Sequence, residues 1–173
     1  MDTRPGAPSH GTTHQGYSDD SCWARGQAWG IYGFALGHLH SGRPDLVTLA
    51  AKLANYFLNR LPGDLICRWD LIFTEGDAPR DTSAAAIAAC GLLELVRHMQ
   101  PGDADRDLYT RAAWGMTKAL ARHLAPLETS NGVLAEGVYH MPNRIGVSEC
   151  CIWGDYFYLE ALVRMRRNWR PYW

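Results

Sequence analysis

The stretch of sequence that decides the fold is residues 23–41, WARGQAWGIYGFALGHLHS. Its apolar side chains recur at the spacing of one helix face, and they are Trp23, Ala24, Ala28, Ile31, Ala35, Leu36 and Leu39. Asp20 or Ser21 can cap the start of this helix, because short oxygen-bearing side chains accept hydrogen bonds from its first free N–H groups. Ser41, Gly42 and Pro44 end it. The pattern predicts a helix from about residue 21 to residue 41.

Four glycines, Gly26, Gly30, Gly33 and Gly37, form a bare stripe along this helix. Each glycine costs a helix roughly 1 kcal/mol relative to alanine, so the stripe needs a compensating contact. Close packing of a neighbouring inner helix would supply one, because two backbones can approach where side chains are missing. A ligand pressed against the stripe is the alternative.

The rest of the chain predicts four more helices, separated by breaks that contain glycine or proline. They cover about residues 44–61, 82–100 and 152–167, together with a helix that carries Leu108 to Leu120 and ends before Pro126. Pro44 suits a first helical turn, and Asp81 or Thr82 can cap the third helix. Residues 64–80 are predicted to be irregular. No convincing strand is predicted, although residues 133–139 could form a short hairpin arm.

The order of these helices predicts a two-layer, all-α architecture. Helices that begin near residues 21, 81 and 152 alternate with two connecting helices that carry ordinary amphipathic stripes. At this repeat length a closed ring of six hairpins would need about 360 residues. The chain has 173 residues. We therefore expect a partial (α/α) barrel over residues 20–173, preceded by a loop or N-terminal remnant over residues 1–19.

The composition is that of a globular protein, with 47% hydrophobic and 20% charged residues. The formal net charge is -1, and no dense basic block occurs outside a short arginine-rich end, so nucleic acid is not an expected partner. No run approaches the roughly 18 consecutive apolar residues of a membrane span, and the first residues lack the apolar core of a signal peptide. We expect no membrane insertion and a cytoplasmic location.

The cysteines and histidines predict neither a disulfide framework nor a metal site. The cysteines lack any Cys-x-x-Cys spacing and are expected to be reduced, structural thiols: Cys22, Cys67, Cys90, Cys150 and Cys151. His10 and His14 lie four positions apart, but Gly11 and the loop-like surroundings deny them the helical geometry that would bring both to one ion. We therefore expect no metal and no organic cofactor.

One face of the first predicted helix carries Arg25, Trp29 and Tyr32 at helical spacing. This spacing would place the Arg25 guanidinium above the Trp29 indole. One interpretation is a site in which arginine binds a carboxylate and tryptophan stacks on a sugar, since a helix N-terminus favours anions. The other is a cation-π pair that only braces the helix.

Four segments of the chain form a recognisable set. They are Gly-Thr-Thr-His-Gln-Gly-Tyr at residues 11–17, Trp-Ala-Arg-Gly-Gln-Ala-Trp-Gly at 23–30, Pro-Arg-Asp-Thr-Ser-Ala-Ala at 79–85 and Glu-Cys-Cys-Ile-Trp-Gly-Asp-Tyr-Phe-Tyr at 149–158. Together they resemble glycoside hydrolase family 88, the unsaturated glucuronyl hydrolases. The related unsaturated rhamnogalacturonyl hydrolases usually show Arg-Gly-Asn-Gly-Trp where this chain has Arg-Gly-Gln-Ala-Trp. The resemblance extends from about residue 10 to the end of the chain.

The resemblance implies an (α/α) six-hairpin toroid, of which this chain holds about the second half. It also implies that an aspartate protonates C4 of a 4,5-unsaturated uronic acid while water adds at C5, after which the hemiketal opens and releases the sugar. By the same resemblance, Gln15 and Arg25 contact the uronate, Trp29 stacks on the sugar and His14 lines the same mouth. The expected ligand is an unsaturated uronic-acid oligosaccharide.

The catalytic acid is not covered by the resemblance. The family's acidic residues lie in segments such as Asp-x-x-His-Asp-x-Gly-Phe of the amino-terminal half, and no segment of this chain matches them. Asp81 and Asp155 belong to other motifs, where capping a helix is the simplest role. We expect a fragment without the catalytic acid, which associates with itself or with a missing amino-terminal half. A noncatalytic helical-repeat module that binds an acidic sugar or a partner protein is the alternative.

Overall fold

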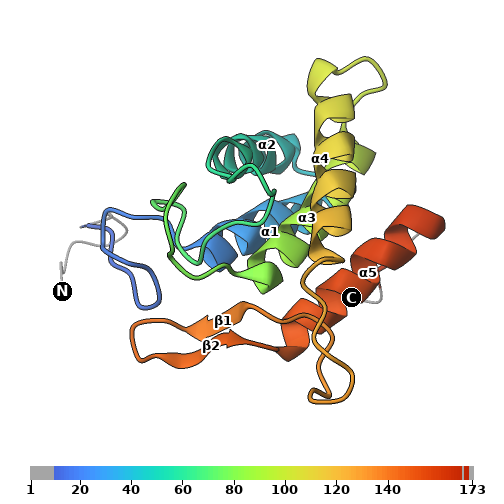
Figure 1. Ribbon diagram of the computed structural model, residues 1–173. Helices are drawn as coiled ribbons and strands as arrows, with labels where there is room; N and C mark the ends of the chain where they lie inside the picture. The colour runs from blue at the N-terminus through green and yellow to red at the C-terminus, as the bar shows by residue number, and fades with distance from the viewer. Residues whose placement is uncertain (1–9, 169, 172–173) are drawn as a thin grey trace.

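The computed structural model describes residues 10–168 and 170–171, and it is mostly helical with one β-hairpin (Figure 1). Its elements are α1 (Ala24–Ser41), α2 (Pro44–Asn59), α3 (Thr82–His98), α4 (Ala104–Leu120), β1 (Gly137–His140), β2 (Ile145–Glu149) and α5 (Ile152–Arg166). Each helix predicted from the sequence is present. Of the predicted N-terminal loop, residues 1–9 lie outside the described residues, and residues 10–19 contain neither helix nor strand.

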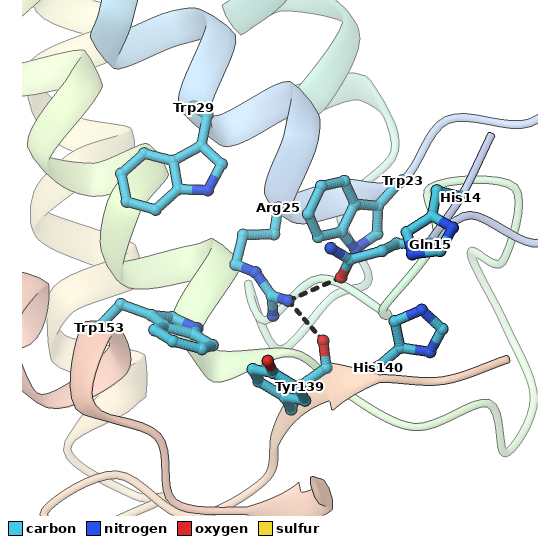
Figure 2. A pocket seen from close by; sticks show the side chains of 8 residues that line it. All are labelled: His14, Gln15, Trp23, Arg25, Trp29, Tyr139, His140 and Trp153. Carbon is cyan, nitrogen blue, oxygen red and sulfur yellow. Dashed lines mark hydrogen bonds between the residues drawn. The ribbon is translucent and has the colours of Figure 1, made fainter. Parts of the chain in front are cut away.

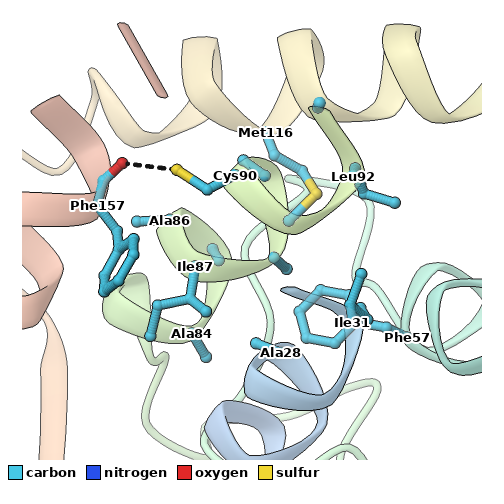
Figure 3. Close-up of a cluster of buried hydrophobic side chains, with 14 of the residues drawn as sticks. Ala28, Ile31, Phe57, Ala84, Ala86, Ile87, Cys90, Leu92, Met116 and Phe157 are labelled. Carbon is cyan, nitrogen blue, oxygen red and sulfur yellow. Dashed lines mark hydrogen bonds between the residues drawn. The ribbon is translucent and has the colours of Figure 1, made fainter. Parts of the chain in front are cut away.

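Helices α1, α3 and α5 form an inner row in which α3 lies between the other two. Helix α2 packs on α1, and α4 packs on α3. Every residue of α3 from 82 to 92 is buried, and its many alanines let the neighbouring helices come close. Figure 3 shows α3 surrounded by Ile31 of α1, Met116 of α4 and Phe157 of α5. The predicted alternation of inner and connecting helices is confirmed.

Helix α1 begins at Ala24, later than predicted. The hydroxyl of Ser21 donates to Oδ2 of Asp70 at 2.7 Å, so it does not cap the helix. Trp23 occupies the N-cap position, and its side chain makes no capping hydrogen bond. The prediction of Asp20 or Ser21 as the cap was wrong. The helix begins after Trp23, and the Ser21 hydroxyl donates its hydrogen bond to Asp70 in the irregular segment.

Two of the four stripe glycines of α1, Gly30 and Gly37, face α2 and not another inner helix. A Cβ added at Gly30 would lie 2.8 Å from Leu53, and one added at Gly37 would lie 3.1 Å from Leu46, both in α2. The close approach of two inner helices occurs at Gly91 of α3, where an added Cβ would lie 2.9 Å from the backbone of α1. Helix packing was therefore the correct interpretation for Gly30 and Gly37, with a different partner helix, whereas an added Cβ at Gly26 would meet Trp23 and one at Gly33 would meet nothing within 4 Å.

The β-hairpin corrects the purely helical prediction. Its two strands are antiparallel and span residues 137–149, so the hairpin begins after the start of the arm suggested for residues 133–139. At its base the backbone N–H of Val138 donates to Oδ1 of Asp81 at 3.4 Å, which fastens the hairpin to the N-terminus of α3. Strands of four and five residues give a weak periodicity signal, which explains the error.

A buried cluster of polar side chains ties the three inner helices together. Nη1 of Arg164 in α5 donates to Glu94 in α3 at 2.6 Å, and its Nε donates to Glu160 at 2.7 Å. The hydroxyl of Tyr32 in α1 donates to Glu160 at 2.6 Å. Glu94 is fully buried and the Arg164 side chain is 3% exposed. Tyr32 thus belongs to this cluster and does not share a surface site with the other residues of its predicted face.

Candidate functional site

A cavity of about 390 Å³ lies where the N-terminal loop, α1, β1 and the start of α5 meet (Figure 2). The side chains that line it are His14, Gln15, Trp23, Arg25, Trp29, Tyr139, His140 and Trp153. The four residues suggested from the sequence, His14, Gln15, Arg25 and Trp29, are all among them. The fold therefore brings segments from both ends of the chain to one cavity.

The loop that carries His14 and Gln15 is held by a buried carboxylate, that of Asp70. Its Oδ2 accepts hydrogen bonds from the backbone N–H of Tyr17 at 2.9 Å and from the hydroxyl of Ser21 at 2.7 Å. Asp70 is 0% exposed, so these bonds fully replace water around that oxygen. The anchor gave no signal in the sequence, because it lies in the irregular segment of residues 64–80.

The guanidinium of Arg25 is 4% exposed and is surrounded by protein acceptors. Its Nη1 donates to Oδ2 of Asp81 at 3.1 Å and to the carbonyl of Val138. Its Nη2 donates to Oε1 of Gln15 at 3.1 Å and to the carbonyl of Tyr139 at 2.7 Å. A ligand carboxylate that took two hydrogen bonds from Arg25 would have to replace some of these acceptors.

The predicted stacking of Arg25 on Trp29 is wrong. The guanidinium carbon lies 4.8 Å from the ring centroid of Trp23 and 5.2 Å from that of Trp153. Long side chains on a helix lean toward its N-terminus, which carries Arg25 away from a residue one turn further along. Trp29 instead meets the edge of Phe157 at a centroid distance of 5.1 Å and remains 39% exposed at the cavity.

Asp81 caps α3, as predicted, and also holds the cavity wall. Its Oδ1 accepts from the backbone N–H groups of Ser83 at 3.1 Å and Ala84 at 3.3 Å. Its Oδ2 accepts from Arg25, and the carboxylate is 0% exposed. Burial raises the pKa of Asp81, and the positive charge of Arg25 opposes that shift.

Sequence reasoning missed half of the cavity wall. Trp23 and Trp153 lie within two of the segments that carry the family resemblance. As aromatic residues in these segments, they could have been predicted to line the site. Tyr139 lies at the end of the arm suggested for residues 133–139 but was not singled out as a site residue, and His140 lies just beyond that arm, in β1 of the observed hairpin. In the structure the rings of His14 and His140 meet edge to face at 5.1 Å between centroids.

Within residues 10–168 and 170–171, no group of three or more His, Cys, Asp or Glu side chains is placed to hold a metal ion. No helix in the same part of the chain is long and apolar enough to cross a membrane. The cysteines are free thiols, and burial raises the pKa of Cys67 and Cys90.

No protein-family model matches the chain. Over 176 aligned residues it is 48% identical to an unsaturated chondroitin disaccharide hydrolase of Streptococcus pneumoniae, covering 100% of this chain and 44% of that protein. It is 42% identical to an unsaturated glucuronyl hydrolase of Bacillus sp. strain GL1, covering 100% of this chain and 47% of that protein. A solved unsaturated glucuronyl hydrolase of Streptococcus agalactiae superposes with a TM-score of 0.90 at 44% identity, covering 100% of this chain and 47% of that one.

The chain thus spans under half the length of the relatives that it matches, and within them it corresponds to the carboxy-terminal portion. Another solved relative, described as specific for heparin, has a TM-score of 0.84 at 32% identity, covering 92% of this chain and 43% of that one.

Proposed function

We propose that this chain, which is homologous to the carboxy-terminal portion of the unsaturated glucuronyl hydrolases, forms the sugar-binding part of a hydrolase that hydrates the 4,5 double bond of unsaturated glucuronyl oligosaccharides. In this proposal its hairpins make up part of an (α/α) toroid. The observation that carries it is the convergence of His14, Gln15, Arg25 and Trp29 on one cavity.

The chemistry of the cavity supports an acidic sugar as its ligand. Indole and phenol rings of Trp23, Trp29, Tyr139 and Trp153 supply flat apolar walls, and His14, Gln15 and Arg25 supply polar groups. Mostly aromatic walls with a few directed polar groups are typical of small-molecule sites. A mutant of the Streptococcus agalactiae relative was solved in complex with dGlcA-GalNAc6S, and we propose a ligand of this class for the present chain.

The first prediction concerns turnover. The chain alone should bind unsaturated chondroitin disaccharide but hydrate it no faster than the background reaction, because the acidic segments expected from the resemblance are absent from its sequence. A positioned proton donor commonly contributes about 10² to 10⁴ in rate. The measurement follows the ultraviolet absorbance of the unsaturated ring in chondroitin, heparin and gellan fragments, with a complete homologue as the positive control. Turnover that survives purification would place the acid within this chain.

The second prediction concerns Arg25. Replacing it by lysine should weaken binding of the unsaturated disaccharide by about 1 to 3 kcal/mol, because lysine keeps the charge but loses the planar fork. Calorimetry would compare this disaccharide with one whose carboxylate is reduced to an alcohol. The wild-type chain should bind the disaccharide with the carboxylate much more tightly than the reduced one. The Arg25→Lys variant should show a much smaller difference in affinity between the two.

A matched control for Arg25→Lys is Arg60→Lys. Arg60 also donates to backbone carbonyls, those of Leu71 and Ile72, but it does not line the cavity. This control should bind both disaccharides as wild type does. If Arg25→Lys discriminates between the two ligands as well as wild type, Arg25 only braces the cavity wall.

The third prediction concerns partners. One face of α5 exposes four apolar side chains: Ile152 (74%), Tyr156 (37%), Leu159 (61%) and Leu162 (38%). Contiguous apolar patches of this kind recruit partners. We propose that this face pairs with a second copy or with an amino-terminal portion of the same kind of enzyme.

Sedimentation at tens of micromolar should therefore find the wild-type chain self-associated and the Leu159→Lys variant largely monomeric. The control is Leu127→Lys, because Leu127 is 90% exposed but lies in the loop after α4. This control should associate as wild type does. A monomeric wild-type chain would refute self-association.

A further inference from the structure

Two N–H groups at the cavity lack an acceptor. Nε2 of His140 and Nε1 of Trp153 are both buried, and neither has a hydrogen-bond partner among the described residues. Both side chains line the cavity of Arg25 and Trp29. Buried polar groups in folded proteins are nearly always hydrogen-bonded, so an orphaned pair at one cavity calls for a partner that is not part of the chain.

The hydrogen bond at Nδ1 of His140 shows which of its two ring nitrogens carries the proton. The backbone N–H of Asn143 donates to Nδ1 of His140 at 3.2 Å, so Nδ1 must be the unprotonated, accepting nitrogen. A neutral imidazole has one donor and one acceptor, which leaves the proton on Nε2. The turn between β1 and β2 thus presents His140 Nε2 as a hydrogen-bond donor.

Trp153 is held in place by its neighbours. Its ring lies 5.2 Å from the guanidinium carbon of Arg25 and 5.4 Å from the ring of Tyr139, tilted by 31°. Figure 2 shows the indole beside Arg25 and Tyr139 at the wall of the cavity. An indole N–H can only donate. Since both orphaned groups are donors, the missing partner must offer acceptor atoms.

We propose that His140 Nε2–H and Trp153 Nε1–H each donate a hydrogen bond to an acceptor oxygen of the sugar ligand, and that they make His140 and Trp153 specificity-determining residues. This inference rests on the proposed function and adds two residues to the four suggested by the sequence. Carboxylate, ether and carbonyl oxygens all satisfy such donors, whereas a sugar that presents an ammonium group there does not. The terminal N–H groups of Arg25 already have protein acceptors, whereas these two donors have none, so a ligand oxygen that reaches them after a small shift of the covering side chains takes no acceptor from the protein.

The test uses the full chain and unsaturated chondroitin disaccharide, with binding measured by calorimetry. His140→Phe and Trp153→Phe keep an aromatic ring but remove the N–H, and each should weaken binding by about 3- to 10-fold. His140→Gln, whose amide nitrogen can replace Nε2 as a donor, should recover most of the affinity. Trp114→Phe is the matched control, because Trp114 is 50% exposed on α4 and does not line this cavity.

A second measurement does not depend on variants that fold. In the ¹⁵N-labelled wild-type chain, the Trp153 indole and His140 imidazole N–H resonances should move downfield when the disaccharide is added. Wild-type affinity in both phenylalanine variants, with these resonances unmoved, would overturn this inference and leave the proposed function standing. If the wild-type chain binds no disaccharide at all, the proposed function fails and the inference fails with it.

Discussion

Replacing Asp81 by asparagine should lower the free energy of unfolding by about 3 to 5 kcal/mol, the cost of removing one partner of a buried ion pair. Arg25 is 4% exposed and would keep its charge without a counter-charge beside it. Asparagine also places an NH₂ group where Asp81 now accepts from Ser83, Ala84 and Val138 at Oδ1 or from Arg25 at Oδ2. Urea unfolding followed by circular dichroism at neutral pH would measure the loss.

The control for Asp81→Asn is Asp155→Asn, the same chemical change at another inner helix. Asp155 does not cap α5; its Oδ1 accepts one hydrogen bond, from the backbone N–H of Leu134 at 2.8 Å. Losing or weakening one such bond should cost only about 1 kcal/mol. Equal losses of unfolding free energy in the two variants would mean that the buried charge of Arg25 does not need Asp81 as its counter-charge.

A double variant separates the ion pair from the cap. Arg25→Met combined with Asp81→Asn removes both charges, so its loss should be smaller than the sum of the two single losses. Strict additivity would contradict the coupling. Because Asp81 also holds the base of the hairpin, the same variant should loosen the wall that carries Tyr139 and His140.

The Arg164→Met variant should lose a similar amount, about 3 to 5 kcal/mol, because it removes the buried cation that Glu94 and Glu160 share and leaves Glu94 with the half-exposed Arg97 as its remaining arginine. Arg164 donates to Glu94 at 2.6 Å and to Glu160 at 2.7 Å, and both acids are at most 2% exposed. Arg97→Met is the control. Arg97 also pairs with Glu94, at 3.2 Å, but it is 45% exposed, so its loss should stay below about 1 kcal/mol.

The loss in Arg164→Met should depend on pH. Burial alone would raise the pKa of Glu94, but the hydrogen bond and charge of Arg164 outweigh it and hold the pKa below the ordinary value of 4.5. A carboxylate with a depressed pKa stabilises the fold fully above its unfolded pKa and loses that contribution as the pH falls through the folded value. Protonation of Glu94 also removes its poorly compensated charge in the variant. The difference in unfolding free energy between wild type and Arg164→Met should therefore shrink below pH 4.5. A constant difference would show that Arg164 acts by packing alone.

The sequence by itself determined where most helices lie, because their signals are local. Pro44 begins α2, Asp81 caps α3, and Gly42, with a φ of 70°, ends α1 in a left-handed conformation that glycine adopts readily. Local spacing also singled out Arg25 and Trp29. The resemblance of the segments added His14 and Gln15, and the cavity contains all four.

Only the tertiary structure decided what these residues touch. Asp70 takes the Ser21 hydroxyl and thereby shifts the start of α1, and Asp81, far along the chain, neutralises Arg25. The hairpin then supplies Tyr139 and His140, which complete the cavity. The periodicity of apolar residues and the capping residues depend on contacts within one helix or strand, so they can be recognised from the sequence alone. The partners of a buried charge come from other elements, so they are set only when the helices pack and each buried charge must find its counter-charge or donor.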